Sequence, residues 1–171
     1  MTAYVALLRA VNVAGTGKLP MRELQRMGEE CGFDKVRTFI ASGNLLFVSK
    51  AGEDDVRTCL STRVAAFFGR DVPVFVRSAA EMAALAQGNP FPDDKPSRVM
   101  AYVIDEEPSA AMLAEARQVQ GERMALGPRA LYVSYGEGIG SSKLKLPAAA
   151  AGTARNMNSV GRMAALLAEL K

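Results

Sequence analysis

Basic and amide side chains occur at several places in the 171-residue sequence where they could bind an anion. Arg9 and Asn12 follow a short apolar run, and Lys18 lies just ahead of a predicted helix. An arginine beside backbone N–H groups at a helix start can hold a phosphate or a carboxylate. The alternative is a loop in which the asparagine caps a turn and the arginine meets an acidic neighbour. Residues 15–18 are not a phosphate-binding P-loop, because they lack the GxxxxGK[ST] spacing.

A second candidate is Ser42-Gly43-Asn44, which lies between two predicted strands. Ser42 could act as a nucleophile only beside a base, and without histidine that base would be a lysine or a carboxylate. We favour a tight turn, in which Gly43 supplies a positive φ and Asn44 tolerates a left-handed conformation. Such a turn could still present amide groups to a ligand.

The remaining candidates lie near the end of the chain. Lys143 stands within the polar segment 141–145, and Arg155 and Asn156 precede the last predicted helix. Cations beside hydroxyl groups and a helix start suit phosphate or carboxylate recognition. For Asn156 and for Asn158 we favour an ordinary helix N-cap, whereas Arg155 fits either interpretation.

The residue types also exclude several kinds of chemistry. The chain has no histidine, which excludes Ser/His/Asp triads, Cys/His pairs and histidine-ligated zinc. Cys31 and Cys59 have no CxxC spacing, so we interpret them as small apolar residues of helices. Paired acids such as Asp54-Asp55 lie near helix starts or in polar loops, where they complement the helix dipole. We therefore predict no metal site and no cofactor.

Composition indicates an ordinary globular protein, with 49% apolar and 23% charged residues. The net charge of +3 is not concentrated in any run of like charges, so nucleic-acid binding is permitted but not indicated. No apolar stretch approaches the roughly 18 residues that span a bilayer, and residues 1–5 lack the cationic start of a secretory signal. We expect a cytoplasmic protein with no membrane contact.

The apolar periods of residues 1 to about 77 predict the order βαββαβ, the split βαβ motif of ferredoxin-like folds. Runs of β-branched and aromatic residues predict the strands, and apolar residues at spacings of three and four predict the helices. The predicted strands are 4–8, 36–40, 45–48 and 72–76, and the predicted helices are 21–31, 56–68 and a short one around 82–85.

The pattern begins again after a loop at residues 88–92, which divides the chain into halves 1–88 and 89–171. The second half reads βαββα, without an obvious last strand, and residues 136–155 form a long polar segment of the kind that is often functional. We predict an α+β fold of two ferredoxin-like βαββα(β) halves, each an antiparallel sheet with helices packed on one face. The predicted strands here are 99–104, 123–126 and 131–135, and the predicted helices are 108–119 and 160–167.

Four separated segments carry a resemblance to a known family: Leu7–Val13, Thr38–Asn44, Ser142–Leu144 and Thr153–Ser159. These segments resemble, in order and over essentially the whole chain, the motifs of domain-of-unknown-function family 1697. The family consists mostly of uncharacterised bacterial proteins, so the resemblance implies a fold and no activity. Ala10 and Ala14 stand where the family commonly has glycine, and Met157 where it commonly has tryptophan.

Several functions fit these observations. The first is a module that binds a small anionic ligand between the two halves, through Arg9, Asn12, Lys143 and Arg155. The second is RNA or single-stranded nucleic-acid binding, because ferredoxin-like sheets can present an open face to bases, although the strands lack the expected aromatic pattern. The third is a group-transfer or hydrolytic enzyme with Ser42 or Lys143 as the reactive residue. The fourth is self-association through an apolar sheet face.

Overall fold

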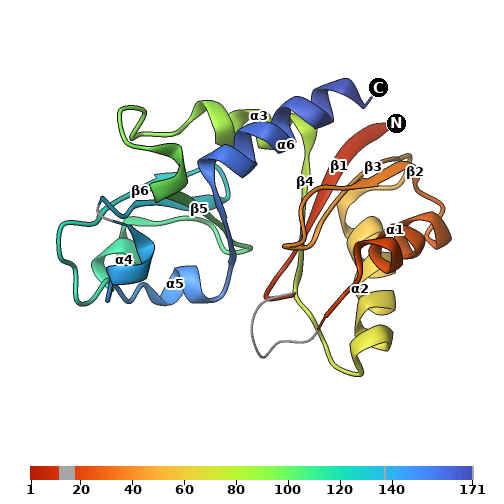
Figure 1. Cartoon of the computed structure of the whole chain (residues 1–171), viewed down its shortest axis with the longest axis horizontal. Helices are drawn as coiled ribbons and strands as arrows, with labels where there is room; N and C mark the ends of the chain where they lie inside the picture. Colours follow the sequence, from red (N-terminus) through yellow and green to blue (C-terminus); the bar gives the residue numbers. More distant parts are fainter. Residues whose placement is uncertain (12–17, 137, 171) are drawn as a thin grey trace. The chain divides into compact units, whose positions relative to one another are not determined.

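The computed structural model describes residues 1–11, 18–136 and 138–170, and Figure 1 shows their course. The fold is α+β, with two four-stranded antiparallel sheets, which confirms the predicted class. The strands are β1 Thr2–Leu8, β2 Asp34–Thr38, β3 Asn44–Ser49, β4 Val74–Ser78, β5 Val99–Val103, β6 Arg123–Gly127, β7 Ala130–Ser134 and β8 Thr153–Asn156. The α-helices are α1 Met21–Glu30, α2 Glu53–Phe68, α3 Ala79–Gln87, α4 Ala110–Ala114, α5 Pro147–Ala150 and α6 Met157–Glu169. Two short 3₁₀ helices span Pro96–Arg98 and Ile139–Ser141.

Two compact units make up the chain, and the first takes residues from both of its ends. The first unit comprises Met1–Ala80 together with Met163–Lys171, and the second comprises Glu81–Arg162. These two units are defined by contacts within the structure. They do not test the predicted folding domains 1–88 and 89–171, which stay a prediction.

In the first unit the strand order is β2-β3-β1-β4, as in a ferredoxin-like sheet. Figure 1 shows α1 and α2 on the same side of this sheet. Alternate residues of the central strand face the helices: Ala6 pairs with Leu45 on one side and with Val76 on the other, and all three are fully buried. The aromatic residues Tyr4 and Phe47 lie on the same face, with ring centroids 5.7 Å apart.

Both helices of the first unit follow from local sequence. In α1, Leu24 and Met27 are buried while the residues between them are polar, so the apolar stripe faces the sheet. The helix approaches the sheet closely at Gly28, where an added Cβ would lie 2.9 Å from Cδ2 of Leu45. The longer α2 ends at Gly69, whose φ of 70° gives the left-handed cap that glycine favours.

The second unit repeats the same arrangement, with strand order β6-β7-β5-β8. Tyr102 pairs with Leu131 in the register of β5 and β7, and α4 and α5 pack on this face. The opposite face carries Tyr132, which is 1% exposed and donates its hydroxyl hydrogen to the carbonyl oxygen of Leu85 in α3 at 2.7 Å. The two sheets therefore share one strand order, which agrees with the predicted repeat.

The second unit differs from prediction in three elements, of which one is α5, a short helix within the polar segment 136–155 where none was predicted. Its last strand, which the sequence did not suggest, is β8, paired antiparallel with β5 through Ala101 and Arg155. It has four residues with only one apolar side chain, too few to produce an apolar period. The predicted helix 108–119 is wrong in length, because α4 ends at Ala114. Beyond it Gln118 has a φ of 56°, and the backbone of Arg117 pairs with that of Lys145 instead of continuing the helix.

The two cysteines form a disulfide, so their interpretation as small apolar residues is wrong. Cys31 directly follows α1 and Cys59 lies within α2, with their Cα atoms 6.0 Å apart. The sequence spacing gave no indication of the pair, because only the packing of the two helices against one another brings the residues together.

None of the described helices combines the length and the apolar character that crossing a membrane requires.

Candidate functional site

Three segments of the first unit meet where β1 ends. The backbone N–H of Leu8 donates to the carbonyl oxygen of Gly43 at 2.9 Å, and that of Arg9 donates to the carbonyl oxygen of Pro73 at 3.0 Å. The end of β1, the turn between β2 and β3 and the residues ahead of β4 are thus joined by backbone hydrogen bonds. We call this region, residues 8–10, 39–44 and 73, the β1 edge.

The turn within the β1 edge is stabilised by Asn44, which is fully buried. Its Nδ2 donates to the carbonyl oxygen of Phe39 at 2.8 Å and to Oγ of Ser42 at 3.1 Å. Gly43 has a φ of 85°, and a Cβ added there would lie 2.5 Å from Cγ2 of Val11. Gly43 thus supplies the predicted positive φ. Asn44 does not adopt the predicted left-handed conformation, because it is the first residue of β3 and stabilises the turn through its side-chain amide instead. Ser42 accepts a hydrogen bond within the turn.

Two other residues of the β1 edge have strained backbones. Ala10 has a φ of 54° and Ile40 a φ of 50°, values at which a side chain bearing Cβ is unfavourable. Ile40 is β-branched and half exposed, so burial of its side chain does not explain the strain. Backbone strain of this kind is concentrated at functional sites in proteins, and here two such positions lie in adjoining segments.

Arg9 supplies the cation of the β1 edge. It is partly buried, and within residues 1–11, 18–136 and 138–170 its guanidinium makes no hydrogen bond or ion pair. Lys18 is exposed, and it is the first described residue after the segment that follows Val11. Asn12, the third predicted ligand of this region, lies outside the described residues. The sequence pointed to Arg9, but the absence of a partner for its side chain is seen only in the structure.

In the second unit, Arg155 is buried on β8. Its Nη1 donates to Oγ1 of Thr153 at 2.8 Å and to the carbonyl oxygen of Ala154 at 2.9 Å, and burial lowers its pKa to about 10. Oδ1 of Asn156 accepts the backbone N–H of Ser159 at 2.9 Å, the hydrogen bond of a helix N-cap. Asn156 thus caps α6, and Arg155 is held within its own strand.

Lys143 is exposed in a segment that a carboxylate organises. Glu122, which is 8% exposed, accepts a hydrogen bond of 2.6 Å from Oγ of Ser142, and Ser142 Oγ accepts the backbone N–H of Leu144 at 3.2 Å. The hydrogen bond from Ser142, followed by that from the backbone N–H of Gln120, lowers the pKa of Glu122. Sequence reasoning missed Glu122, because a single acid ahead of a short strand carries no distinguishing pattern.

Two tyrosines of the second unit share a hydrogen bond between their hydroxyl groups. Tyr102 of β5 and Tyr135, just after β7, are both partly buried. Burial raises the pKa of each, and for Tyr135 the hydrogen bond with Tyr102 and the nearby carboxylate of Glu122 raise it further. Both phenols are therefore neutral near pH 7 and do not act as bases there.

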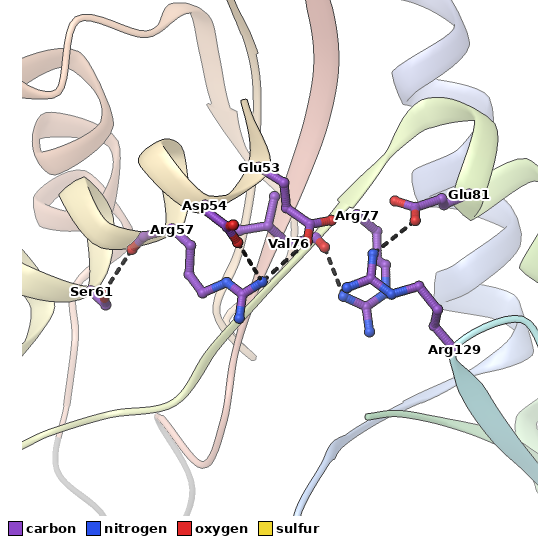
Figure 2. Close-up of polar contacts among 8 residues, drawn as sticks. All are labelled: Glu53, Asp54, Arg57, Ser61, Val76, Arg77, Glu81 and Arg129. Carbon is purple, nitrogen blue, oxygen red and sulfur yellow. Dashed lines mark hydrogen bonds and ion pairs between the residues drawn. The ribbon is translucent and has the colours of Figure 1, made fainter. Parts of the chain in front are cut away.

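Several acidic residues are paired with arginines instead of being grouped with one another. Nη2 of Arg57 in α2 lies 3.1 Å from Oε2 of Glu53 and 3.5 Å from Oδ1 of Asp54, two acids of the first turn of the same helix (Figure 2). In the second unit Arg129 forms an ion pair with Glu81, with Nη1 2.8 Å from Oε1. No cluster of three or more cysteine, aspartate or glutamate side chains suited to a metal ion occurs in the described part of the chain.

Asp94 shows the same preference for protein partners. It accepts a hydrogen bond of 2.5 Å from Oγ of Ser134 and pairs with Arg123, whose guanidinium also lies 4.7 Å from the ring centroid of Phe91. The hydrogen bond from Ser134, and then the contacts with Arg123, lower the pKa of Asp94. Asp94 therefore ties β6 and β7 to the loop that precedes β5.

The family model described as "Protein of unknown function (DUF1697)" matches residues 1–132. The chain belongs to the DUF1697 family. The matched region of this DUF1697 protein contains Arg9 and the whole β1 edge, whereas Lys143, Arg155 and Asn156 lie beyond it.

A solved structure shares the fold of this DUF1697 protein. It is described as a conserved bacterial protein, SP0830, from Streptococcus pneumoniae, and it aligns with a TM-score of 0.80 and 22% sequence identity over 97% of this chain and 98% of that one. The similarity supports the fold over nearly the full length and carries no activity. The comparison with curated proteins finds no match.

Proposed function

We propose that this DUF1697 protein binds a small anion bearing a phosphate or a carboxylate at the β1 edge. The observation that carries the proposal is the guanidinium of Arg9, which is partly buried and has no hydrogen-bond or ion-pair partner within the described residues. Partial burial of a charge is unfavourable unless a counter-charge or hydrogen-bond acceptors compensate it. A bound anion would supply both, and the planar guanidinium suits two oxygens at once.

The backbone of the β1 edge supports this proposal. Ala10 lies directly after Arg9, and Ile40 lies in the turn that is joined to β1 through Gly43. A loop that is held by hydrogen bonds of its own backbone and of the Asn44 side chain keeps a fixed shape, which reduces the ordering cost of binding. Lys18 and the hydroxyl of Ser42 are the further candidate ligands in the first unit.

Lys143, Arg155 and Asn156 contribute less to the proposal than the sequence suggested. Arg155 is 6% exposed and Asn156 caps α6, so each already has a part in the architecture. Lys143 is exposed and remains a candidate ligand in the second unit.

Nucleic-acid binding is the second candidate, and the aromatic side chains count against it. Open ferredoxin-like sheets stack bases on aromatic residues of their central strands. Here Tyr4 and Phe47 face the helices of their own unit, and Tyr102 lies in the apolar cluster of the second unit. The hydroxyl group of Tyr132 donates a hydrogen bond to the carbonyl oxygen of Leu85 in α3. The net charge of +3 alone would give weak, salt-sensitive binding.

Catalysis by Ser42 is a third candidate with less support. The hydroxyl oxygen of Ser42 accepts a hydrogen bond from the amide of Asn44, an interaction that orders a turn and does not activate a nucleophile. Ser42 is therefore included in the proposal as a ligand of the anion.

Thermal shift and calorimetry with inorganic phosphate, sugar phosphates, nucleotides and small carboxylates test the proposal. A ligand at 100 times its Kd should raise the free energy of unfolding by about 2.7 kcal/mol. We expect Arg9→Ala to abolish the shift and Arg9→Lys, which keeps the charge but not the planar fork, to weaken it.

Arg22→Ala is the matched control, because Arg22 is an exposed arginine of the same unit with no side-chain partner among the described residues. It should leave binding unchanged. A shift that survives Arg9→Ala, or that Arg22→Ala removes equally, would contradict the assignment to the β1 edge. A salt-sensitive shift with short RNA only would favour the second candidate.

A further inference from the structure

The disulfide between Cys31 and Cys59 lies at the surface of the first unit. It joins the end of α1 to the middle of α2, across 28 residues of sequence, and both cysteines are partly exposed. Arg63, which contacts Cys31, and Glu30 also line a shallow depression of about 280 Å³ between α1 and α2, although neither cysteine lines it. The partial exposure of both cysteines leaves the bridge open to a small thiol from solvent.

A cation lies directly against one sulfur of the bridge. Nε of Arg63, one helical turn after Cys59 in α2, donates to Sγ of Cys31 at 3.3 Å. Nη2 of Arg63 donates to the carbonyl oxygen of Glu30 at 3.1 Å, and its Nη1 lies 3.5 Å from Oε2 of Glu30, so the guanidinium is held in place. A guanidinium beside a cysteine favours the thiolate, which is the form that reacts.

Two negative charges oppose the effect of the Arg63 guanidinium on the thiolate of Cys31. The C-terminal end of α1 carries partial negative charge, and the carboxylate of Glu30 partly neutralises Arg63. The hydrogen bond from Nε is directed at the sulfur itself, and no comparable donor is recorded for Cys59 in the described structure. The two sulfurs are therefore chemically unequal, as in disulfides that exchange with thiols.

The core beneath the bridge does not depend on it. Leu24 and Met27 of α1 and Leu60 and Val64 of α2 are at most 4% exposed, and they pack with the sheet. Reduction would remove the covalent connection between the helices while this apolar contact remains. The native packing of the two helices is therefore still available to the reduced protein, at a lower stability.

We propose that Cys31 and Cys59 form a reversible thiol–disulfide exchange site for small thiols of the glutathione type, with Arg63 as the residue that favours the thiolate of Cys31. In the reducing direction a thiolate of the small thiol attacks Sγ of Cys59, and Cys31 leaves as a thiolate beside Arg63. A second thiol attacks the resulting mixed disulfide and releases Cys59. Two electrons and two protons pass from two small thiols, which become one small-molecule disulfide, to the protein, which becomes a dithiol.

The test uses the full chain equilibrated in buffers of varied reduced and oxidised glutathione, followed by trapping of free thiols with a maleimide and mass measurement. We expect a reversible transition within this range. A bridge that stays intact in excess reduced glutathione, or a pair that stays reduced in excess oxidised glutathione, would overturn the proposal.

A second experiment tests the part assigned to Arg63. It measures, as a function of pH, the rate at which iodoacetamide alkylates Cys31 in the reduced protein. Arg63→Ala should slow this reaction several-fold near pH 7 and move its pH profile upward, whereas Arg63→Lys should retain most of the rate. Arg22→Ala, a change of an exposed arginine elsewhere on α1, should have no effect. If Arg63→Ala does not fold, Arg63→Gln takes its place as the variant without the cation, and a pH profile of that variant equal to that of the unchanged protein would show that Arg63 has no such part.

Discussion

The backbone N–H of Leu8 lies 2.9 Å from the carbonyl oxygen of Gly43, so the end of β1 is bonded directly to the turn between β2 and β3. Gly43 also approaches Leu8 and Val11 so closely that no Cβ fits there. Any change in the turn should therefore be transmitted to the backbone of Arg9, the next residue along β1.

Gly43→Ala should lower the free energy of unfolding by about 2–4 kcal/mol, because left-handed strain adds to overpacking against Val11. Gly69→Ala is the matched control: its φ is also positive, at 70°, but a Cβ there meets open space, so its cost should be only about 1 kcal/mol. Urea unfolding of both variants checks the difference. Equal losses would show that the close approach at Gly43 carries no energetic weight.

Ile40→Gly should relieve the strain at a φ of 50°, which is worth about 1–2 kcal/mol, and lose about 0.5–1 kcal/mol to the added freedom of the unfolded chain. Ile139 offers a control, since it is 51% exposed against 50% for Ile40 but its φ is not positive. Ile139→Gly should only destabilise. In chemical denaturation, the free energy of unfolding of Ile40→Gly should thus exceed that of Ile139→Gly by about 1–2 kcal/mol. The reverse order would remove the evidence for strain.

Reduction of the Cys31–Cys59 bridge should lower the free energy of unfolding by about 3–4 kcal/mol, since the bridge closes a loop of 28 residues in the unfolded chain. Denaturant titrations with and without dithiothreitol measure this. A variant with both cysteines changed to serine should match the reduced protein and show no response to dithiothreitol. A response in that variant would mean that the reductant acts elsewhere.

Ser142→Ala should raise the pKa of Glu122 towards its ordinary value, because the hydrogen bond from Ser142 is the largest cause of its lowering. A carboxyl whose folded-state pKa is lowered stabilises the fold above its unfolded pKa, near 4.5, and this contribution is lost as the pH falls through the lowered value. Carbon-detected NMR titration of Glu122 reports the shift. Ser141→Ala is the control, because Ser141 bonds the carbonyl oxygen of Gly138 and not Glu122; an equal shift in both variants would contradict the assignment.

Much of the fold could be predicted because its central elements carry strong apolar periods. The strand β1 and the helices α1 and α2 lie close to their predicted positions, since each buries a continuous apolar face. The strand β8 could not be predicted, because its four residues are held by pairing with β5, a relationship between distant segments. The disulfide was missed for the same reason, since it depends on how α1 and α2 pack.

The candidate site was predictable in part. The positive φ of Gly43 followed from residue type, because local backbone chemistry determines it. The conformation predicted for Asn44 was wrong, because pairing in β3 keeps its backbone extended. The lack of a side-chain partner for Arg9 among the described residues and the strain at Ile40 could not be predicted, since both depend on tertiary surroundings. Arg155 shows the opposite case: a basic residue near a helix start looked available to a ligand, yet it is buried on a strand that the sequence did not reveal.

The first unit is assembled from Met1–Ala80 and Met163–Lys171, and Leu167 and Leu170 line the same cavity of about 830 Å³ as Ala3 and Val48. A ribosome therefore delivers the last part of the first unit only after it has made the whole of the second. During translation the strands and helices of residues 1–80 are therefore made before residues 163–170. Until then, the region of Ala3 and Val48 is open to solvent or to a chaperone. Loss of residues 163–170 would thus damage the half of the protein that was synthesised first.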